Sequence, residues 1–537
     1  MTQPGITRIL PMSDRAILVE YTDLDAVLAH FAPLESAALA GVEELIPAAS
    51  TTMVRFDPTL TDARSLARRI REVPAAEHAA SDHDAVTVDV VYSGEDLAGL
   101  ADSLGVSSEE LVRRHTEATW RGAFAGFAPG FVYCVGDDPF FEVPRRPSPR
   151  TRIPAGSVAL AGNFSAVYPR ESPGGWQLIG RTPERMWDLE RTPPAFIQPG
   201  QEVRYRAVRD EVDLSGAAPR TTELPPVPGD ARALEIVRPG AQLLLQDLGR
   251  AGMLGMGVAA SGAADRRALR AANRIVGNDS DTAVLELAGG GAELLACAEG
   301  VIAWTGASGR RTIVSAEGDE YPFERGVPTA VSAGDRIHLS GFTRGLRGYL
   351  AVRGGFAVDD VLGSLTTDTL SGVGPQPLAA GDVLPLGDDR AARAVEPNDA
   401  ARPELPAHDE LVEIDIVLGP RTDWFSAAAL ETLTGQEWRV TAQSDRVGVR
   451  LEGDTPLERA VTAELPSEGA VTGAIQVPAN GQPVLFLPDH PLTGGYPVIG
   501  AVIDADLDRA GQLAPGMRVR FRVVHRFTEL SATEDQS

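Results

Sequence analysis

The sequence contains no lysine, so all 49 of its basic residues are arginine. A chain without lysine cannot form a lysine Schiff base, use a P-loop lysine or carry biotin on a lysine side chain. Any phosphate that this protein binds must therefore contact arginine side chains, backbone amides or a metal ion.

Cysteine and long apolar runs are also scarce. Cys134 and Cys297 lie far apart in apolar surroundings, which excludes a disulfide framework and a CxxC pair of metal ligands. No run of about 18 or more apolar residues occurs, and the first residues lead into a strand-like stretch instead of a leader peptide. We therefore expect a cytoplasmic protein that does not bind membranes.

The charge of the chain limits its partners. Acidic residues number 75 against 49 basic ones, which gives a formal net charge of -26. Such a charge disfavours nucleic acid and anionic membrane surfaces as binding partners.

Strand, helix and turn patterns predict four units. The first unit alternates strand-like and helical stretches, which indicates a small α/β subdomain. Later, short β-type runs alternate with turns, and the 55 glycines and 40 prolines favour turn-rich barrels. We expect an α/β subdomain at 1–84, a barrel at 85–213, a linker at 214–232, a further β unit at 233–390, a linker at 391–409, a second barrel at 410–527 and a disordered tail at 528–537.

An internal repeat indicates that the two barrels are related. The stretch "GGWQLIG" at 174–180 recurs as "GGYPVIG" at 494–500, with aromatic, apolar and glycine positions in step. Upstream of each copy, a glycine is followed by alternating apolar residues, in "AGSVALAG" and "TGAIQVPANG". We interpret the repeat as one turn in each of two barrels of the same type; the alternative is a chance similarity of seven residues.

Two groups of residues in the first half could carry chemistry. A proline-rich stretch holds four arginines that either bind a carboxylate or phosphate or pair with surface carboxylates: Arg145, Arg146, Arg150 and Arg152. His115, at the end of an expected helix, is either a general base or a satisfied polar residue.

Two further groups lie in the second half. The glycine-rich stretch "QDLGRAGMLGMGVAASGAAD" could bring backbone amides to an anion at the start of the next helix, which Asp265 can cap and Gly277 can end. This stretch matches neither GxGxxG nor a P-loop, and it contains Gln246, Asp247, Arg250 and Ser261. Turns of the last unit hold residues that either line a site or simply form turns: Asp445, Arg446, Glu468, Gln476, Asp489 and Thr493.

Several motifs resemble known families. The stretches "GFAPGFVYC", "PRRPSPRTRIPAGSVALAG" and "SPGGWQLIGRTP" resemble the B-type subunit of 5-oxoprolinase, also called KipI or allophanate hydrolase subunit 1. The stretches "LQDLGRAGMLGMGVAASGAAD", "SDRVGVRLEG", "GAIQVPANGQPVLFLPD" and "TGGYPVIG" resemble its C-type subunit, the KipA or allophanate hydrolase subunit 2 family. Because the motifs occur in order along nearly the whole chain, it resembles a natural fusion of the B and C components of 5-oxoprolinase.

The same modules are similar to the carboxyltransferase domain of biotin-dependent urea carboxylase. The resemblance implies a mainly β fold with α+β parts, in which cyclophilin-like β-barrels occupy both halves and a small α/β subdomain lies at the N-terminus. It also implies opening of 5-oxo-L-proline to L-glutamate with ATP and Mg²⁺, together with a separate A-type subunit of the LamB/YcsF family. One departure is that Phe164 and Ser165 stand where the family usually has Gln-Thr.

The implied reaction suggests roles for the candidate residues. The lactam carbonyl is unreactive, so it must be activated, most simply by phosphoryl transfer from ATP, before water attacks. We expect the four arginines to clamp anionic groups and His115 and Asp489 to act as acid and base. Asp247 and Glu468 are expected to be metal or positioning ligands, and Glu468 is also a candidate catalytic residue. The remaining expected substrate or phosphate contacts are Gly174, Gly175, Gln246, Arg250, Ser261, Arg446, Gln476 and Thr493.

Two other functions stay open. A carboxyltransferase for urea or a related amide would need a separate biotin carrier, since this chain has no biotin attachment site. A KipI/KipA-like regulator of a histidine kinase is disfavoured, because an inhibitor and its antagonist on one chain could not be regulated separately. The sequence leaves the oligomeric state open, and a homo-oligomer is one of the arrangements it allows.

Overall fold

The computed structural model describes residues 5–76, 84–146, 148, 150–209, 224, 231–390, 392–395 and 405–530. Most of the two expected linkers and of the expected C-terminal tail lies outside these ranges. Strands account for 38% of the residues and helices for 15%, so the predicted mainly β fold with barrels in both halves is confirmed. Among the described residues, no helix combines the length and the apolar character needed to cross a membrane.

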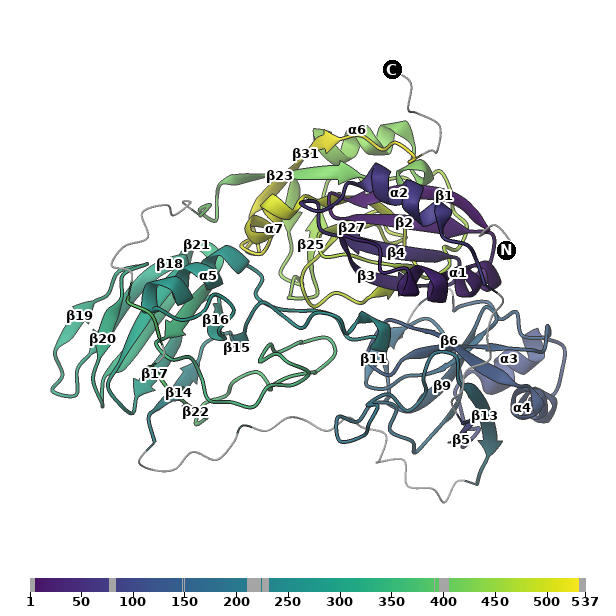
Figure 1. Ribbon diagram of the computed structural model, residues 1–537, viewed down its shortest axis with the longest axis horizontal. Helices are drawn as coiled ribbons and strands as arrows, with labels where there is room; N and C mark the ends of the chain where they lie inside the picture. The colour runs from purple at the N-terminus through teal and green to yellow at the C-terminus, as the bar shows by residue number, and fades with distance from the viewer. Residues whose placement is uncertain are drawn as a thin grey trace.

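The N-terminal unit is a four-stranded antiparallel sheet with two helices on one face (Figure 1). Its strands lie in the order β1-β2-β4-β3, and its elements are β1 (Ile6–Ser13), β2 (Ala16–Tyr21), α1 (Leu24–Ser36), β3 (Val42–Pro47), β4 (Thr51–Phe56) and α2 (Ala63–Glu72). Both faces of the sheet are apolar. Ile9 and Val19 pack under the helices, whereas the alternate residues Leu10 and Leu18 pack against the last barrel.

The first barrel follows directly in the sequence. Its seven-stranded sheet has the order β12-β9-β10-β7-β6-β13-β5, and a bridge between Val91 and Arg181 joins the two ends. The elements are β5 (Val86–Val90), α3 (Leu97–Ser103), α4 (Ser108–Glu117), β6 (Trp120–Ala125), β7 (Val132–Gly136), β8 (Arg150–Ile153), β9 (Ser157–Ala161), β10 (Phe164–Val167), β11 (Ser172–Gly174), β12 (Gln177–Arg181) and β13 (Glu202–Ala207). Strands β8 and β11 form a separate pair.

A nine-stranded β unit opens the second half of the chain (Figure 1). Its elements are β14 (Ala233–Pro239), β15 (Gln242–Gln246), α5 (Arg266–Val276), β16 (Val284–Ala288), β17 (Ala292–Ala296), β18 (Gly300–Val314), β19 (Glu320–Pro322), β20 (Thr329–Val331), β21 (Arg336–Val352) and β22 (Val383–Pro385). Helix α5 begins and ends as predicted. Asp265 accepts a hydrogen bond from Ala268 N at the start, and Gly277 adopts a φ of 81° at the end.

The second barrel is closed, in the order β23-β30-β27-β28-β25-β24-β31. Its elements are β23 (Leu411–Leu418), α6 (Ala427–Gly435), β24 (Trp438–Val440), β25 (Gly448–Glu452), β26 (Glu468–Gly469), β27 (Ala474–Gln476), β28 (Val484–Phe486), β29 (Thr493–Gly494), β30 (Val498–Val502), α7 (Asp504–Ala510) and β31 (Arg518–His525). Strands β26 and β29 form a separate pair, as β8 and β11 do in the first barrel.

The two barrels have the same arrangement of strands. Reading both sheets from β12 and β30 gives matching strand orders, and each barrel contains one parallel pair, β5 with β13 and β23 with β31. Gly174 pairs with Arg150 in the first barrel and Gly494 pairs with Glu468 in the second. The "GGWQLIG" and "GGYPVIG" segments therefore occupy equivalent positions, which supports the interpretation of the repeat.

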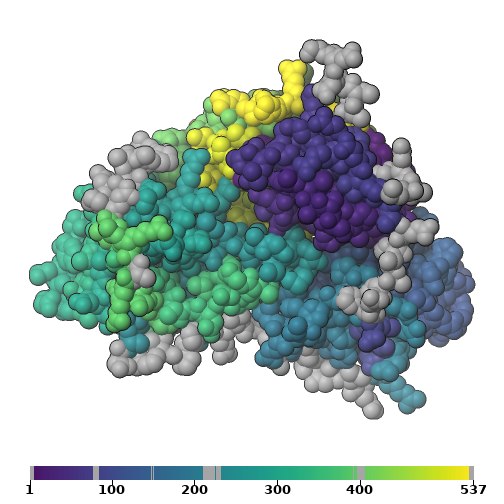
Figure 2. Space-filling model, in the orientation of Figure 1, coloured from purple at the N-terminus to yellow at the C-terminus, as the bar shows by residue number. Residues whose placement is uncertain are grey.

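The three other parts of the chain pack around the second barrel. The sheet of the N-terminal unit lies against β23 and β30. Leu530 N donates a 2.9 Å hydrogen bond to the carbonyl of Ile9, so the two ends of the described chain are neighbours. Figure 2 shows the purple N-terminal atoms directly beside the yellow C-terminal atoms. This packing creates the junction at which the candidate site lies.

Candidate functional site

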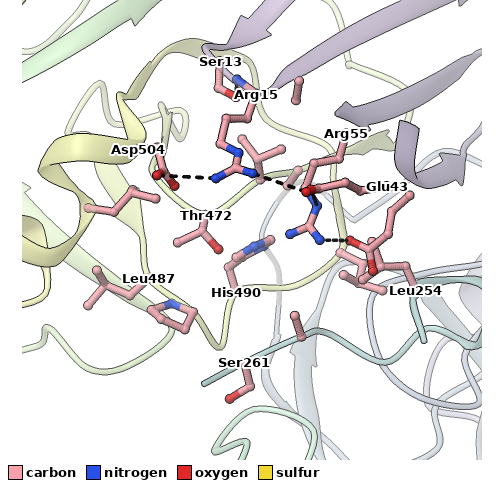
Figure 3. A pocket seen from close by; sticks show the side chains of 18 of the residues that line it. Ser13, Arg15, Glu43, Arg55, Leu254, Ser261, Thr472, Leu487, His490 and Asp504 are labelled. Atoms are coloured by element: carbon pink, nitrogen blue, oxygen red, sulfur yellow. Dashed lines mark hydrogen bonds and ion pairs between the residues drawn. The ribbon is translucent and has the colours of Figure 1, made fainter. Parts of the chain in front are cut away.

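A cavity of about 260 Å³ lies where the N-terminal sheet, the glycine-rich segment and the second barrel meet (Figure 3). The turn from β1 to β2 and the strands β3 and β4 contribute Arg15, Glu43 and Arg55. The glycine-rich segment contributes Ser261, and the second barrel contributes a wall that includes His490. No single half of the chain forms this cavity, since its walls come from both.

Charged side chains line the N-terminal side of the cavity. Arg15 lies 3.3 Å from Glu43 and 3.5 Å from Asp504, measured between nitrogen and oxygen atoms. Arg55 lies 3.2 Å from Glu43 and 2.7 Å from Glu44. Burial raises the pKa of Glu44 even though Arg55 is close to it. Apolar side chains from both halves line the rest of the cavity, among them Ile46, Met53, Leu254, Leu487 and Leu492.

His490 projects into this cavity from the second barrel (Figure 3). Its Nδ1 lies 2.9 Å from the carbonyl oxygen of Pro491, so Nδ1 carries the proton and Nε2 carries the lone pair. The ring stacks on Phe486 with an interplanar angle of 6°. Burial lowers the pKa of His490 to about 4, which keeps the ring neutral at pH 7.

Sequence reasoning missed His490. The residue lies in the motif "LPDHPLTGGYP", which drew attention to the adjacent Asp489 because carboxylates are common acids and bases. A lone histidine beside a proline carries no spacing signal, so only the position of the cavity identifies it.

A buried network beneath the cavity gathers several of the predicted residues. Asp489 accepts hydrogen bonds from Arg446 Nε and Nη2 at 3.0 and 3.1 Å, and from Ser261 Oγ at 2.5 Å. The backbone N and Oγ1 of Thr369 donate to the same carboxylate at 2.9 and 2.7 Å. Burial alone would raise the pKa of Asp489, but these partners, Arg446 above all, hold it below its usual value. A carboxylate held in this way is a poor proton acceptor, so its surroundings favour a structural role over the expected acid/base role.

Arg446 joins the second barrel to the nine-stranded unit. It is fully buried and also forms an ion pair with Glu286 of β16 and a 2.6 Å hydrogen bond to the carbonyl of Gly262. Asp489 and Glu286 therefore match its charge inside the protein, and its burial favours a structural role over the expected contact with a substrate phosphate.

Gln246, Asp247 and Arg250 anchor the segment 361–367. Asp247 accepts four hydrogen bonds, from Gly249 N, Ser364 Oγ, Leu365 N and Thr366 Oγ1, at 2.7 to 2.8 Å. Arg250 donates to the carbonyls of Thr366 and Val361, and Gln246 donates to that of Thr367. The expected metal role of Asp247 has no support here, because its oxygens are already occupied.

The four expected clamp arginines do not form one site. Arg146 and Arg150 both bind Asp96, at 2.5 and 2.8 Å, whereas Arg152 pairs with Glu171 at the surface. Arg145 pairs with Glu464 at 2.9 Å and donates to Ser467 Oγ at 3.3 Å. Each of these guanidinium groups already has a carboxylate partner, which favours the alternative that they pair with acidic side chains over the expected clamp.

His115 lies in the core of the first barrel. It is fully buried, with Nδ1 2.7 Å from the Tyr92 hydroxyl and Nε2 3.0 Å from Ser165 Oγ. Burial lowers its pKa to about 3. Trp120 Nε1 donates to the carbonyl of His115 as Trp438 Nε1 does to that of Leu433, so a leucine fills the equivalent position of the second barrel. These surroundings favour a packing role for His115 over the expected acid/base role.

Two of the remaining predicted residues, Glu468 and Thr493, join neighbouring units. Glu468 forms an ion pair with Arg421, which also contacts Glu20 of the N-terminal sheet at 2.8 Å. Thr493 Oγ1 accepts a hydrogen bond from Phe127 N of the first barrel at 3.1 Å, and Gln476 donates to the carbonyl of Tyr496 at 3.2 Å. These contacts make Glu468 and Thr493 interface residues.

Gly174, Gly175 and Trp176 belong to the wall of the first barrel. A Cβ atom on Gly174 would lie 2.3 Å from the Tyr168 hydroxyl, and Gly175 O accepts a 2.8 Å hydrogen bond from Arg146 N. Trp176 is buried against Phe131 and Tyr133. A second cavity, of about 640 Å³, lies between the barrels and is lined by Arg145 and Phe164 among others.

Two family models match the chain in consecutive order. Residues 7–197 match "Carboxyltransferase domain, subdomain C and D", and residues 256–523 match "Carboxyltransferase domain, subdomain A and B". A solved structure, that of TTHA0988, is 33% identical, covers 95% of this chain and 99% of its own, and superposes with a TM-score of 0.81.

Curated relatives match the two halves separately. The C-type subunit of 5-oxoprolinase from Escherichia coli (strain K12) is 34% identical over 309 residues, 56% of this chain and 95% of that protein. The B-type subunit of 5-oxoprolinase from Bacillus subtilis (strain 168) is 33% identical over 202 residues, 34% of this chain and 83% of that protein. The urea amidolyase of Saccharomyces cerevisiae is 34% identical over 322 residues, but this match spans only 17% of that larger protein.

Proposed function

This chain belongs to the carboxyltransferase-domain family that includes the B and C components of 5-oxoprolinase, and from that premise we propose that it is the fused B and C component of an ATP-dependent 5-oxoprolinase. In this role it would bind 5-oxo-L-proline and, with a separate A-type subunit, open the ring to L-glutamate. We place this activity in the cytoplasm.

The observation that carries the proposal is the cavity shared by the two halves. Its charged wall is formed by Arg15, Glu43 and Arg55 of the B-like half, and its opposite wall by Ser261 and His490 of the C-like half. Residues from separate domains that enclose one cavity are typical of ligand sites. A fusion keeps the two walls together at all protein concentrations.

ATP and Mg²⁺ belong to the proposed reaction, but the described residues do not fit a metal site. They contain no group of three or more His, Cys, Asp and Glu side chains placed to hold a metal ion, and Asp247 is occupied by hydrogen bonds. We propose that the nucleotide and its metal bind where the A-type subunit meets this chain. The chemistry assigned to this chain is then substrate binding, orientation and exclusion of water.

A biotin-dependent carboxyltransferase is the second candidate. Its support is the similarity to urea amidolyase and the two matched carboxyltransferase models. Urea, like 5-oxoproline, is a small amide, so the cavity volume does not separate the two substrates. A separate biotin carrier and biotin carboxylase would be required.

Reconstitution separates the two candidates. Purified chain is mixed with its A-type subunit, ATP, Mg²⁺ and 5-oxo-L-proline, and glutamate and ADP are measured; omission of the A-type subunit is the control. The proposal predicts equal amounts of glutamate and ADP that depend on both proteins. Bicarbonate-dependent consumption of urea with added biotin components, and no glutamate from 5-oxoproline, would overturn it.

A further inference from the structure

Two side chains of the cavity have polar atoms without partners. Nε2 of His490 makes no hydrogen bond with any described residue, although this side chain is 6% exposed. Nη1 of Arg55 makes no hydrogen bond with the described residues, and the ion pairs of Arg55 with Glu43 and Glu44 are closest at Nε and Nη2. Neither atom is engaged by a hydrogen bond inside the described part of the protein, so both can bond to a polar ligand in the cavity.

The two atoms have opposite hydrogen-bonding character. With Nδ1 protonated and bound to Pro491, Nε2 of His490 can only accept, whereas a guanidinium nitrogen can only donate. Figure 3 shows His490 and Arg55 in the same cavity, and the charge of Arg55 acts on the imidazole ring. The wall therefore presents an acceptor and a donor to one small molecule.

A lactam is complementary to this pair. The ring of a five-membered lactam forces the amide to be cis, so N–H and C=O point to the same side of the molecule. An open-chain secondary amide is trans and points these groups in opposite directions. The apolar surfaces of Leu254 and Leu487 suit the methylene groups of such a ring.

We propose that the cavity binds the amide edge of a small lactam, with its N–H donating to Nε2 of His490 and its C=O accepting from Nη1 of Arg55. This inference rests on the proposed function and specifies its substrate contacts. Arg15 also lines the cavity, and its ion pairs with the described residues Glu43 and Asp504 are long, at 3.3 and 3.5 Å. It would take the carboxylate of 5-oxo-L-proline.

The ring of His490 is held in place for this contact. The Pro491 carbonyl fixes its tautomer, and stacking on Phe486, with ring centroids 5.5 Å apart, fixes its plane. A fixed acceptor loses little entropy when the ligand binds. It also discriminates strongly against a ligand that lacks the N–H, because Nε2 would then be covered without a partner.

Calorimetric titration of the full chain tests the contact. The probes are 5-oxo-L-proline and N-methyl-5-oxo-L-proline, which lacks the donor. The variants are His490→Leu, His490→Gln, whose side-chain oxygen can still accept, and His338→Leu as the control at a partly exposed histidine on β21. We expect the wild type and the control to bind 5-oxoproline about tenfold more tightly than the N-methyl probe.

The His490→Leu variant should lose this tenfold preference, and His490→Gln should keep most of it. No binding of 5-oxoproline by the wild type, or an unchanged preference in His490→Leu, would overturn the inference. Failure of the inference and failure of the proposed function are distinguishable. If 5-oxoproline is turned over but is not preferred to the N-methyl probe, the proposed function holds and the inferred contact is wrong. If 5-oxoproline is preferred but not turned over, the inferred contact holds and the proposed function is wrong.

Discussion

Replacement of Asp489 by asparagine tests whether this residue is structural. The side chain keeps its shape, but its negative charge disappears beside Arg446, and both residues are fully buried. Five donor groups point at the two carboxylate oxygens, from Arg446, Ser261 and Thr369. An amide group has one acceptor oxygen, so at least two of these donors lose their partner.

Removal of one partner from a buried ion pair typically costs about 3–5 kcal/mol. Glu286 still pairs with Arg446, so we expect the lower end, about 3 kcal/mol of unfolding free energy. For a domain of about 150–250 residues, a loss of about 3 kcal/mol lowers the melting temperature by about 6–12 °C. Scanning calorimetry and urea unfolding measure both quantities.

The matched control is Asp415→Asn, which breaks a two-bond ion pair with Arg522 at 2.6 and 2.8 Å on the surface. Exposed pairs contribute about 1 kcal/mol or less. If Asp489→Asn is no more destabilising than the control, the structural role is refuted. If it is as stable as the wild type and yet inactive, Asp489 is the acid or base that the sequence suggested.

Three further predictions address residues that the structure reassigns. His115 has a pKa of about 3 when folded and about 6.5 when unfolded, so between pH 8 and pH 5 the unfolded wild type gains a proton that the folded protein does not. The wild type should therefore lose about 2 kcal/mol of unfolding free energy relative to His115→Leu over this pH range. Calorimetry at a series of pH values that shows no such shift would contradict this prediction. Arg150→Met should lose about 2 kcal/mol of unfolding free energy because Asp96 is buried, whereas Arg152→Met should lose less than about 0.5 kcal/mol; equal losses in urea unfolding would refute the separation of these arginines. Gly174→Ala should lose about 1–3 kcal/mol because its Cβ would lie 2.3 Å from the Tyr168 hydroxyl, whereas Gly435→Ala, which meets nothing within 4 Å, should not be destabilised; thermal melts compare the two.

Local patterns in the sequence predicted much of the fold. The "GGWQLIG" and "GGYPVIG" segments identified two equivalent turns because a repeated turn needs the same glycines, and Asp265 and Gly277 marked the ends of α5 because caps depend on neighbouring residues alone. These features can be read from a few adjacent residues.

Long-range partners could not be predicted in this way. Arg446 meets Glu286 across 160 residues and Asp489 across 43, so spacing along the chain gave no sign that their charges cancel. Buried ion pairs and catalytic groups use the same residue types, so the sequence alone could not separate these two roles for Arg446 and Asp489. The surroundings of His115 could not be predicted for a related reason, because a neutral histidine and a leucine can fill equivalent barrel positions.

The equivalent ion pairs of the two barrels illustrate the same limit. Leu178 and Val498 are equivalent residues of the two repeat segments. Asp96 N donates to the carbonyl of Leu178 and Arg421 N donates to that of Val498, so Asp96 and Arg421 occupy equivalent positions. Arg150 and Glu468 are equivalent as well, because they pair with Gly174 and Gly494. The first barrel pairs Asp96 with Arg150, and the second pairs Arg421 with Glu468 with the signs reversed. The sign of the charge at one of these positions can therefore be explained only when the residue that it pairs with is known.

If the cavity formed by both halves is the substrate site of a 5-oxoprolinase component, filling it must stop the reaction. Thr472→Trp places a large ring in this cavity, and Thr343→Trp places the same ring on an exposed strand of the nine-stranded unit. The deciding experiment measures 5-oxoproline-dependent glutamate formation by each variant with the A-type subunit, ATP and Mg²⁺. We predict at least about tenfold loss for Thr472→Trp at an unchanged melting temperature and full activity for Thr343→Trp; full activity of a folded Thr472→Trp variant would contradict the assignment of the site.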